Sequence, residues 1–338
     1  MSTVTWLPEI RRGRFEGALA GAADPAAVDG YTEHPPRMGF FTDTSVCIGC
    51  KACEVACKEW NHVPEDGLNF TGMSYDNTVG LGADTWRHVA FIEQRVSRAD
   101  ADGQLRWLMA SDVCKHCTHA ACLDVCPTGS LFRTEFGTVV VQEDICNGCG
   151  YCIPACPYGV IDQREGDGRA WKCTLCYDRI SDGMEPACAK ACPTDSIQFG
   201  PVEELRQRAA RRVDELHSAG VADARLYGED PDDGVGGDGA FFLLLDEPEV
   251  YGLPPDPVVT TRDLPSMWRH VGAAAAALTV TAAASFVAAV PERLRLGPPS
   301  LTVLRASRCR WVHPRNQELV ARSGHGVTSS AGKCGYGQ

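Results

Sequence analysis

The sequence has no excess of basic residues. Its 338 residues include 32 Lys and Arg against 44 Asp and Glu, so the formal net charge is −12. This balance argues against a general nucleic-acid-binding protein, because such a protein needs a basic face to neutralise phosphates. Hydrophobic residues reach 44% and charged residues only 22%, which allows a buried core and excludes wholesale disorder. The length fits one large or two medium domains.

Familiar catalytic motifs are also missing. No Gly-rich phosphate-binding loop follows an expected strand, and no Ser–His–Asp constellation can be recognised. The spacing C-x3-C-x2-C, typical of radical enzymes, does not occur. Arg11-Arg12 weakly resembles a twin-arginine export signal, but Glu16 and Asp24-Pro25 interrupt the apolar run that should follow. We therefore expect no active site and no cleavable signal, and a surface basic pair explains the two arginines.

Cysteine, in contrast, is abundant. The chain has 18 cysteines, and all except Cys309 and Cys334 fall into four runs. The runs are Cys47-x2-Cys50-x2-Cys53-x3-Cys57, Cys114-x2-Cys117-x4-Cys122-x3-Cys126-Pro, Cys146-x2-Cys149-x2-Cys152-x3-Cys156-Pro and Cys173-x2-Cys176-x11-Cys188-x3-Cys192-Pro. A disulfide scaffold is normally a short secreted domain, which this chain is not. The four runs therefore need a metal-binding interpretation.

The third run, which begins at Cys146, matches the bacterial ferredoxin pattern. In that pattern three closely spaced cysteines bind one [4Fe–4S] cluster, and the fourth, followed by proline, reaches a neighbouring cluster. Two-residue gaps turn the backbone tightly and leave amide N–H groups free to bond the sulfides, whereas the x3 step carries the last thiolate away. Sixteen cysteines at four per cluster predict four [4Fe–4S] clusters.

Other ligand chemistries fit less well. A structural zinc ion takes four ligands in two pairs, and the single loop of the third run would oversupply it. Two-residue gaps hold neighbouring sulfurs in poor geometry for disulfides. His116 and His119 lie beside cluster cysteines, but Rieske-type histidine ligation is unnecessary where four thiolates are available for each cluster. Zinc and histidine ligation therefore stand only as alternatives.

Spacing along the chain indicates how the runs pair. The second and third runs lie close together, and Thr138–Val141 between them is typical of a short strand. They look like one ferredoxin unit inserted into another, whose halves are the first and fourth runs. On this nested interpretation the four ligand sets are Cys47, Cys50, Cys53 and Cys192; Cys173, Cys176, Cys188 and Cys57; Cys146, Cys149, Cys152 and Cys126; and Cys114, Cys117, Cys122 and Cys156.

The expected fold is α+β, with two nested bacterial-ferredoxin-like dicluster units and a C-terminal single transmembrane helix. The expected domains are a loosely ordered N-terminal arm at 1–38, a four-cluster domain at 39–262, a linker and transmembrane helix at 263–292, and a polar tail at 293–338. One dicluster unit comprises 39–57 plus 173–200, and the other comprises 114–160. Strands are expected at 86–96, 105–109 and 240–245, and an amphipathic helix at 203–216.

Four lysines adjoin cluster cysteines, namely Lys51, Lys58, Lys115 and Lys172. A reduced cluster carries more negative charge, so a nearby ammonium group would raise its reduction potential. For any single one of these lysines, an ordinary surface position is at least as good an explanation.

An uncharged segment covers residues 271–290 and would span roughly 30 Å of hydrocarbon as a helix. Ten of its residues are alanine, so a buried soluble helix is the alternative. A Pro-rich linker at Leu253–Pro257 precedes it, and Trp268 is placed to act as an interfacial anchor. These flanks, with small residues suited to packing against partner helices, favour a transmembrane helix.

Charges on either side of this segment predict its orientation. Only Arg262 and Arg269 precede it closely, whereas the arginines that follow are Arg293, Arg295, Arg305, Arg308 and Arg310. The positive-inside rule then places the C-terminal tail in the cytoplasm and the cluster domain on the outer side of the cell membrane. Cys309 and Cys334 are expected to be free thiols in that tail.

Several motifs carry a specific resemblance to a known family. Cys47-Ile-Gly-Cys-Lys-Ala-Cys-Glu-Val-Ala-Cys-Lys-Glu-Trp-Asn61 is similar to the opening motif of the β (iron–sulfur) subunit of membrane-bound formate dehydrogenases. Similar to later motifs of that family are Cys146–Tyr158, Lys172–Arg179, Glu185–Cys188 and Cys192–Thr194. The resemblance covers residues from about 40 to about 255. Relatives in dimethyl-sulfoxide, polysulfide and nitrate reductases and in hydrogenases share the four-run pattern, but Lys58–Asn61 and the trailing helix favour formate dehydrogenase.

This resemblance implies an electron-transfer subunit without an active site of its own. It would take electrons from a molybdopterin (Mo or W) catalytic α subunit that oxidises formate and deliver them to a membrane cytochrome or quinone-reducing γ subunit. It also implies an outward cluster domain, because in this family the twin-arginine signal of the catalytic subunit carries the β subunit across. The alternatives are a subunit of another molybdoenzyme or of a hydrogenase, and a stand-alone polyferredoxin.

Overall fold

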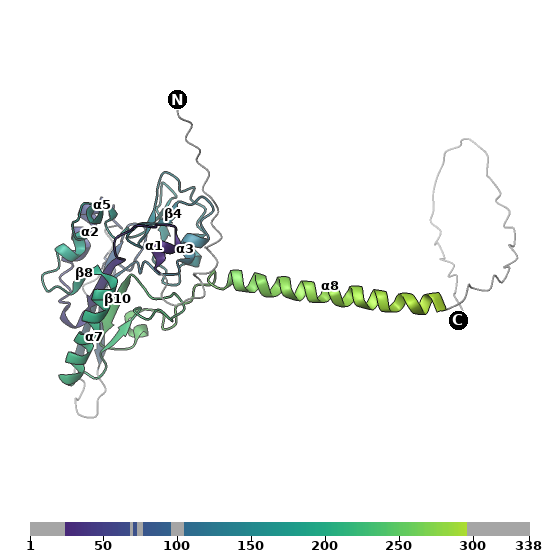
Figure 1. Cartoon of the computed structure of the whole chain (residues 1–338). Coiled ribbons are helices and arrows are strands. Elements are labelled where there is room, and N and C mark those ends of the chain that lie inside the picture. The colour runs from purple at the N-terminus through teal and green to yellow at the C-terminus, as the bar shows by residue number, and fades with distance from the viewer. Residues whose placement is uncertain (1–23, 68–69, 73–76, 96–104, 296–338) are drawn as a thin grey trace, which may run out of the picture. The chain divides into compact units, whose positions relative to one another are not determined.

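A computed structural model describes residues 24–67, 70–72, 77–95 and 105–295 of the chain, with side chains to residue 288 (Figure 1). Its helices are α1 (Pro25–Val28), η3 (Thr44–Val46), α2 (Ala52–Asn61), α3 (Ala121–Asp124), α4 (Cys152–Ala155), α5 (Tyr177–Ser181), α6 (Ala187–Lys190), α7 (Val202–Ser218), η4 (Pro248–Tyr251) and α8 (Leu264–Arg295). Its strands are β1 (Met38–Asp43), β2 (Arg87–Arg95), β3 (Leu105–Val113), β4 (Leu131–Arg133), β5 (Val139–Val141), β6 (Asp162–Gln163), β7 (Ala170–Trp171), β8 (Ile197–Pro201), β9 (Arg225–Tyr227) and β10 (Ala240–Leu244). The described residues divide into two units, one that ends at residue 275 and one that begins at residue 276.

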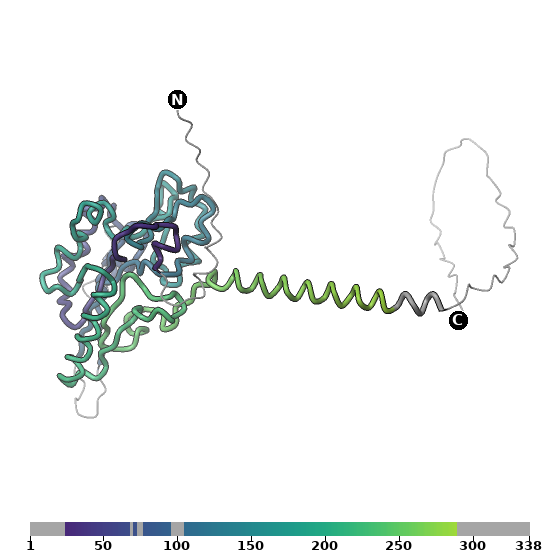
Figure 2. Tube along the Cα trace, in the orientation of Figure 1, coloured from purple at the N-terminus to yellow at the C-terminus, as the bar shows by residue number. Residues whose placement is uncertain are grey.

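A four-stranded sheet in the first unit joins segments that are far apart in sequence. Its strand order is β8-β1-β10-β9, with β1 antiparallel to β8 and parallel to β10. In Figure 2 the purple N-terminal strand accordingly lies among teal and green segments. Strand β1 ends shortly before Cys47, and β8 begins shortly after Cys192. Pairing of these two strands therefore places the first and fourth cysteine runs side by side.

Helix α7 covers one face of this sheet. Its Leu205, Ala209 and Leu216 are buried and pack with Phe41 and Phe241 of the sheet. These positions recur at the spacing of one helical face, which is why the sequence pattern identified the helix. The expected helix at 203–216 is confirmed, with one further residue at its start and two at its end.

The second and third cysteine runs lie next to one another within the first unit. Short helices α3 and α4 contact one another, and the hairpin of β4 and β5 connects the two runs. Strands β2 and β3 form a longer hairpin, in register from Arg87 opposite Val113 to Arg95 opposite Leu105. Residues of this hairpin, among them Val89 and Val113, belong to the same buried core as most of the cluster cysteines.

The strands predicted from the sequence are confirmed, whereas the described part of the N-terminal arm at 1–38 differs from the loose order that was expected. Strands β2, β3, β5 and β10 lie where the sequence placed them, and β3 extends four residues further, to Val113. The described part of the expected N-terminal arm is packed, not loose. Asp24 caps helix α1, Ala26 is fully buried, and the Tyr31 hydroxyl donates to the Arg133 carbonyl at 3.0 Å. Proline at the first helical turn and an Asp cap are helix-start signals that outweigh the Gly/Ala-rich composition.

Helix α8 contains the apolar segment predicted from sequence. The stretch Leu264–Ala288 is long and apolar enough to cross a membrane, and none of its apolar window is buried among the described residues. Its exposed apolar side chains include Met267, Trp268 and Phe286. A helix of this kind fits a membrane span better than the core of a soluble domain. Residues 1–23 and 296–338, with Cys309 and Cys334, lie outside the described residues.

Candidate metal centres

The fold gathers cysteines of the first and fourth runs around one cavity. It holds about 300 Å³ of space free of protein atoms, and Val89, Ser111 and Ile197 complete its wall. The cysteines that line it are Cys47, Cys50, Cys53 and Cys192. Cys50 is exposed whereas Cys53 is buried, so the cavity runs from the surface into the core.

A second cavity, of about 340 Å³, lies between the second and third runs. The cysteines that line it are Cys114, Cys117, Cys122 and Cys156. Lys115, His116 and Lys172 also contribute to its wall. Both cavities are therefore lined by four thiols that come from two different runs.

Electrostatic contacts among thiols indicate the neighbours of the remaining cysteines. Burial raises the pKa of Cys57 well above its usual value, and the thiolates of Cys173, Cys188 and Cys176 raise it further. Burial likewise raises the pKa of Cys152 to about 11, with contributions from its neighbours Cys146, Cys126 and Cys149. These neighbours are among those that the nested ligand sets require, and the full pairing of the sixteen cysteines stays a prediction.

The donor set suits a polynuclear iron–sulfur cluster. All sixteen cysteines are free thiols, and among the described residues no group of three or more His, Cys, Asp or Glu side chains converges on a single ion position. Sulfurs around one tetrahedral zinc ion would lie about 3.8 Å apart, because Zn–S bonds measure about 2.3 Å. Four thiols spread around a cavity instead leave room for several iron atoms, and burial makes their thiolates costly unless a cation is bound.

Left-handed backbone conformations shape the binding loops. Gly49 and Lys51 have φ values of +64° and +59°, and the corresponding residues of the third run, Gly148 and Gly150, have +71° and +73°. A side chain at Gly49 would meet the Phe91 ring at 2.6 Å. These turns wrap the chain around each site, and glycine takes up the conformation at three of the four positions without a steric penalty.

Donors to the cysteine sulfurs come from the backbone and from side chains. Burial acts to raise the pKa of Cys126, but the N–H groups of Leu131, Thr128 and Ser130 and the Thr128 hydroxyl outweigh it, and the pKa is lowered. The Asn61 amide lies 3.7 Å from the Cys57 sulfur and 3.6 Å from the Cys176 sulfur. Donors of this kind stabilise thiolates and metal-bound sulfur. The role of Asn61 was missed from sequence, although it ends the motif Lys58–Asn61.

Two of the four candidate lysines are buried beside the second cavity. The Lys115 ammonium pairs with the Asp112 carboxylate and lies 5.0 Å from the centres of two aromatic rings, of Tyr158 and Phe242. The Lys172 ammonium donates to the carbonyls of Val139 and Cys173. Its charge also acts to lower the pKa of Cys122, which burial raises to about 12. Within the described part of the chain, Lys172 forms no ion pair with a carboxylate, in contrast to Lys115.

The other two candidate lysines are half-buried and have carboxylate partners, although Lys51 also lines the first cavity. Lys51 forms an ion pair with Glu54 at 3.2 Å, within its own helical turn. Lys58 donates to the carbonyls of Pro64 and Asp84 and pairs with Asp66. These contacts tie helix α2 to the segment that follows it, so Lys58 serves structure.

The two histidines beside cluster cysteines are poorly placed as ligands. The Val139 amide donates to Nδ1 of His116 at 3.1 Å, which leaves the proton of the neutral ring on Nε2. Burial and nearby cations hold the pKa of His116 well below its usual range, so the ring is neutral. In this tautomer neither nitrogen offers a lone pair to a metal. Burial and Arg262 also lower the pKa of His119.

Arg87 is a buried cation that sequence analysis missed. It begins strand β2, is 1% exposed, and lies over the Phe40 ring at 4.8 Å. Its Nη1 donates to the carbonyl and hydroxyl of Ser111, whose hydroxyl lies 3.2 Å from the Cys53 sulfur. No sequence signal identified it, because the nearest cysteine in the chain is far away.

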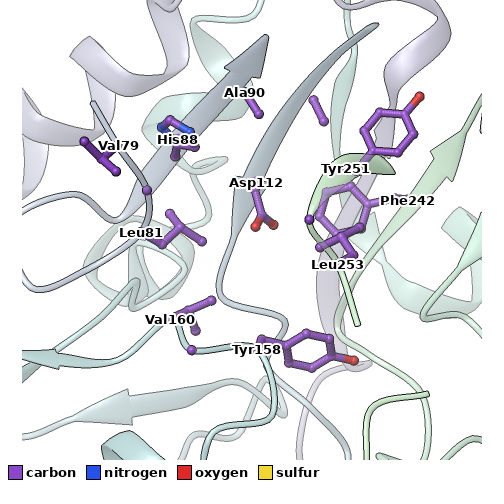
Figure 3. A pocket seen from close by; sticks show the side chains of 14 residues that line it. Val79, Leu81, His88, Ala90, Asp112, Tyr158, Val160, Phe242, Tyr251 and Leu253 are labelled. Atoms are coloured by element: carbon purple, nitrogen blue, oxygen red, sulfur yellow. The ribbon is translucent and has the colours of Figure 1, made fainter. Parts of the chain in front are cut away.

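A further cavity lies away from the thiols. It encloses about 770 Å³ between the β2–β3 hairpin and β10, including space open to solvent. Figure 3 shows Asp112 between Leu81 on one wall and Leu253 on the other, with Tyr158 below. Asp112 is paired with Lys115, and the Tyr158 hydroxyl donates to Asp238 at 2.7 Å. Because these polar groups already have partners, the cavity does not present them to a ligand.

Two family models match the chain, and both are described as a 4Fe-4S dicluster domain. One matches residues 46–130 and the other residues 105–202. The matches overlap in the second cysteine run and together cover all four runs. They establish ferredoxin-type [4Fe–4S] domains, so the fold expected from the cysteine pattern is confirmed.

Curated relatives narrow the family further. The chain is 42% identical to a formate dehydrogenase iron-sulfur subunit of Haemophilus influenzae, over 79% of this chain and 83% of that protein. It is 41% identical to the nitrate-inducible formate dehydrogenase iron-sulfur subunit of Escherichia coli, over 76% and 83%. One polypeptide of the anaerobic dimethyl sulfoxide reductase of E. coli is 38% identical, but over only 51% of this chain and 77% of its own length.

Proposed function

The chain belongs to the family of formate dehydrogenase iron–sulfur subunits, and we propose that it conducts electrons through four [4Fe–4S] clusters from a catalytic to a membrane subunit. The catalytic subunit carries molybdopterin with Mo or W and oxidises formate, and the membrane subunit reduces quinone. The observation that supports four clusters is that four thiols line each of two cavities, while Cys57 and Cys152 have thiols of the two remaining sets as neighbours. When bound, a [4Fe–4S] cluster supplies reversible one-electron transfer.

The residues of the chain hold and tune these sites. We assign the thiolates as ligands in the nested sets, with the backbone amides near Cys126 and the Asn61 side chain as donors to sulfur. Lys172 offers a buried positive charge beside the second cavity, which favours added electrons there. Lys115 is less effective, because Asp112 neutralises it. Lys51 lines the first cavity but is paired with Glu54, and Lys58 is paired with Asp66. We therefore expect these two lysines to contribute less to the reduction potentials than Lys172.

The anchor indicates which sites face the membrane partner. Just before α8, Thr261 donates to Asp124 at 2.6 Å, and Val259 packs on Ala121. Both partners belong to α3, within the second cysteine run. We therefore place the second and third runs nearest the membrane subunit, and the first and fourth runs nearest the catalytic subunit. We further place the cluster domain on the outer side of the membrane and the tail in the cytoplasm.

Reconstitution tests this function. The isolated chain should oxidise no formate, because it has no catalytic centre of its own. With its catalytic partner, formate should bleach the visible iron–sulfur absorbance within turnover time, and a quinone analogue should be reduced only when the membrane subunit is added. If the absorbance persists with formate but bleaches with hydrogen and a hydrogenase subunit, the chain serves a hydrogenase instead.

A further inference from the structure

Arg87 is buried and is connected to the first cavity through Ser111, whose hydroxyl contacts both the guanidinium and the Cys53 sulfur. Burial alone lowers the pKa of an arginine, yet the thiolates of Cys188, Cys53, Cys173 and Cys57 together raise the pKa of Arg87 above its usual value. Cys53 belongs to one ligand set of the first and fourth runs, and the other three belong to the second set. The guanidinium is therefore electrostatically linked to both sets.

Hydrogen bonding leaves part of the guanidinium available. Nη1 is held by Ser111, but the buried Nε and Nη2 atoms have no hydrogen-bond partner among the described residues. A buried donor without a partner costs roughly 1–3 kcal/mol, and more when it is charged. Such a cost is offset when the donors face acceptors that the protein alone does not provide. Sulfur atoms of a bound cluster are acceptors of that kind, and they carry negative charge.

We propose that Arg87 is a positioning residue shared by two clusters, those of the first and fourth runs, and that it raises the reduction potential of both. Its free N–H groups donate to cluster sulfur, and its charge offsets the negative charge that each cluster gains with one electron. This inference rests on the proposed ligand sets. Ser111 fixes the guanidinium, because the same hydroxyl also contacts the Cys53 sulfur.

Redox titration of the complete complex, followed by electron paramagnetic resonance, tests the proposal. In Arg87→Gln the reduction equilibrium constant of two clusters should fall at least tenfold, about 59 mV for a one-electron couple. The potentials of the other two clusters should not change. Arg87→Lys keeps the positive charge but replaces the planar set of guanidinium N–H donors by a single ammonium group. It should therefore recover part of the lost reduction potential.

The control variant is Arg208→Gln, which removes the same charge from an exposed position on α7. It should leave all four potentials as they are. Iron content measured on every sample separates two kinds of failure. Wild-type complex with fewer than four clusters would contradict the proposed function, whereas four clusters with unchanged potentials in Arg87→Gln would contradict only the role of Arg87. A shift in a single cluster would contradict the sharing.

Isotope labelling tests the contact even if Arg87→Gln loses iron. Wild-type complex is prepared with ¹⁵N-arginine in this chain, and hyperfine spectroscopy is recorded on the reduced clusters. A coupling to ¹⁵N is expected, and it should vanish in Arg87→Lys prepared with the same label. Absence of the coupling in the wild-type complex would overturn the proposal.

Discussion

Lys115 and Lys172 differ from Lys51 and Lys58 in burial, although all four adjoin a cysteine in sequence. The first two line the second cavity and are fully buried. Lys51 lines the first cavity but is only half-buried and pairs with Glu54, and Lys58 pairs with Asp66. Sequence position places a lysine near a ligand loop, but the side chain is long enough to point either way. Whether its charge acts on the site depends on tertiary contacts, and these are not encoded in the neighbouring residues.

Exchanging single cysteines tests the nested sets at the residue scale. Cys192→Ser should disturb the cluster that Cys47, Cys50 and Cys53 help to bind, because the four thiols line one cavity. Cys126→Ser should instead disturb the cluster of the third run, since its thiolate acts on Cys152. Electron paramagnetic resonance of each variant, with iron analysis, identifies the affected cluster.

The two variants serve as controls for one another. Each changes one sulfur to oxygen next to a proline, so a general loss of stability should affect both alike. The nested sets require two different clusters to be lost. Loss confined to a third-run cluster in Cys192→Ser would refute them.

The contrast between cysteines and Arg87 shows how far residue patterns reach. Cysteine spacing reports ligand chemistry directly, because the gaps fix how tightly the chain can turn around a cluster. Arg87 has no such pattern, since its effect arises only when the β2–β3 hairpin packs against both thiol sets. Candidate ligands could therefore be named from the sequence, whereas the residue linking two sites required the fold.

At the scale of elements, local periodicity identified the strands and the long helix but not their pairing. The apolar residues of 240–245 predicted a buried strand, and β10 forms there. Nothing in that stretch indicates that β10 lies parallel to β1, about 200 residues earlier. Pairing across such a distance depends on the complementarity of Phe40 and Phe41 with Phe241 and its neighbours. Patterns of single segments contain no information of that kind.

Truncation tests whether α8 is only an anchor. A chain that ends before Arg269 keeps Val259, Thr261 and Arg262, which contact the cluster domain. It loses most of the exposed apolar helix, and the ligand set ends at Cys192. We expect it to leave the membrane fraction with its full iron content. Fractionation and iron analysis give the result.

A truncation that removes more of the chain provides the control. Ending the chain before Ala240 removes β10, a fully buried strand paired with β1. This variant should lose iron, because β1 leads directly into the first cysteine run. If the variant that ends before Arg269 also loses iron, α8 belongs to the folded core, as in a soluble protein.

At the scale of the whole molecule, the cluster domain and the anchor place different demands on the chain. The net charge of −12 works against adding electrons, so buried cations such as Arg87 and Lys172 matter more than surface charge. The flanks of α8, in contrast, are rich in arginine on the C-terminal side. The charges of this protein are therefore unevenly distributed, and the positive-inside rule predicts that the arginines near the helix set its orientation.

The charges that flank the apolar segment predict its orientation in the membrane. Two arginines precede residues 271–290 closely and five follow them within about 20 residues, so the positive-inside rule favours a cytoplasmic C-terminus. The cluster domain should then be cleaved when intact spheroplasts are treated with protease, whereas a tag after residue 338 should survive until the membrane is permeabilised. Removing the excess of positive charge after the helix, by Arg→Gln changes at 293, 295, 305, 308 and 310, should weaken this difference in protease sensitivity. Protection of the cluster domain in intact spheroplasts, with cleavage only after lysis, would place this domain in the cytoplasm. Formate oxidation by the complex would then release protons in the cytoplasm and not outside the membrane.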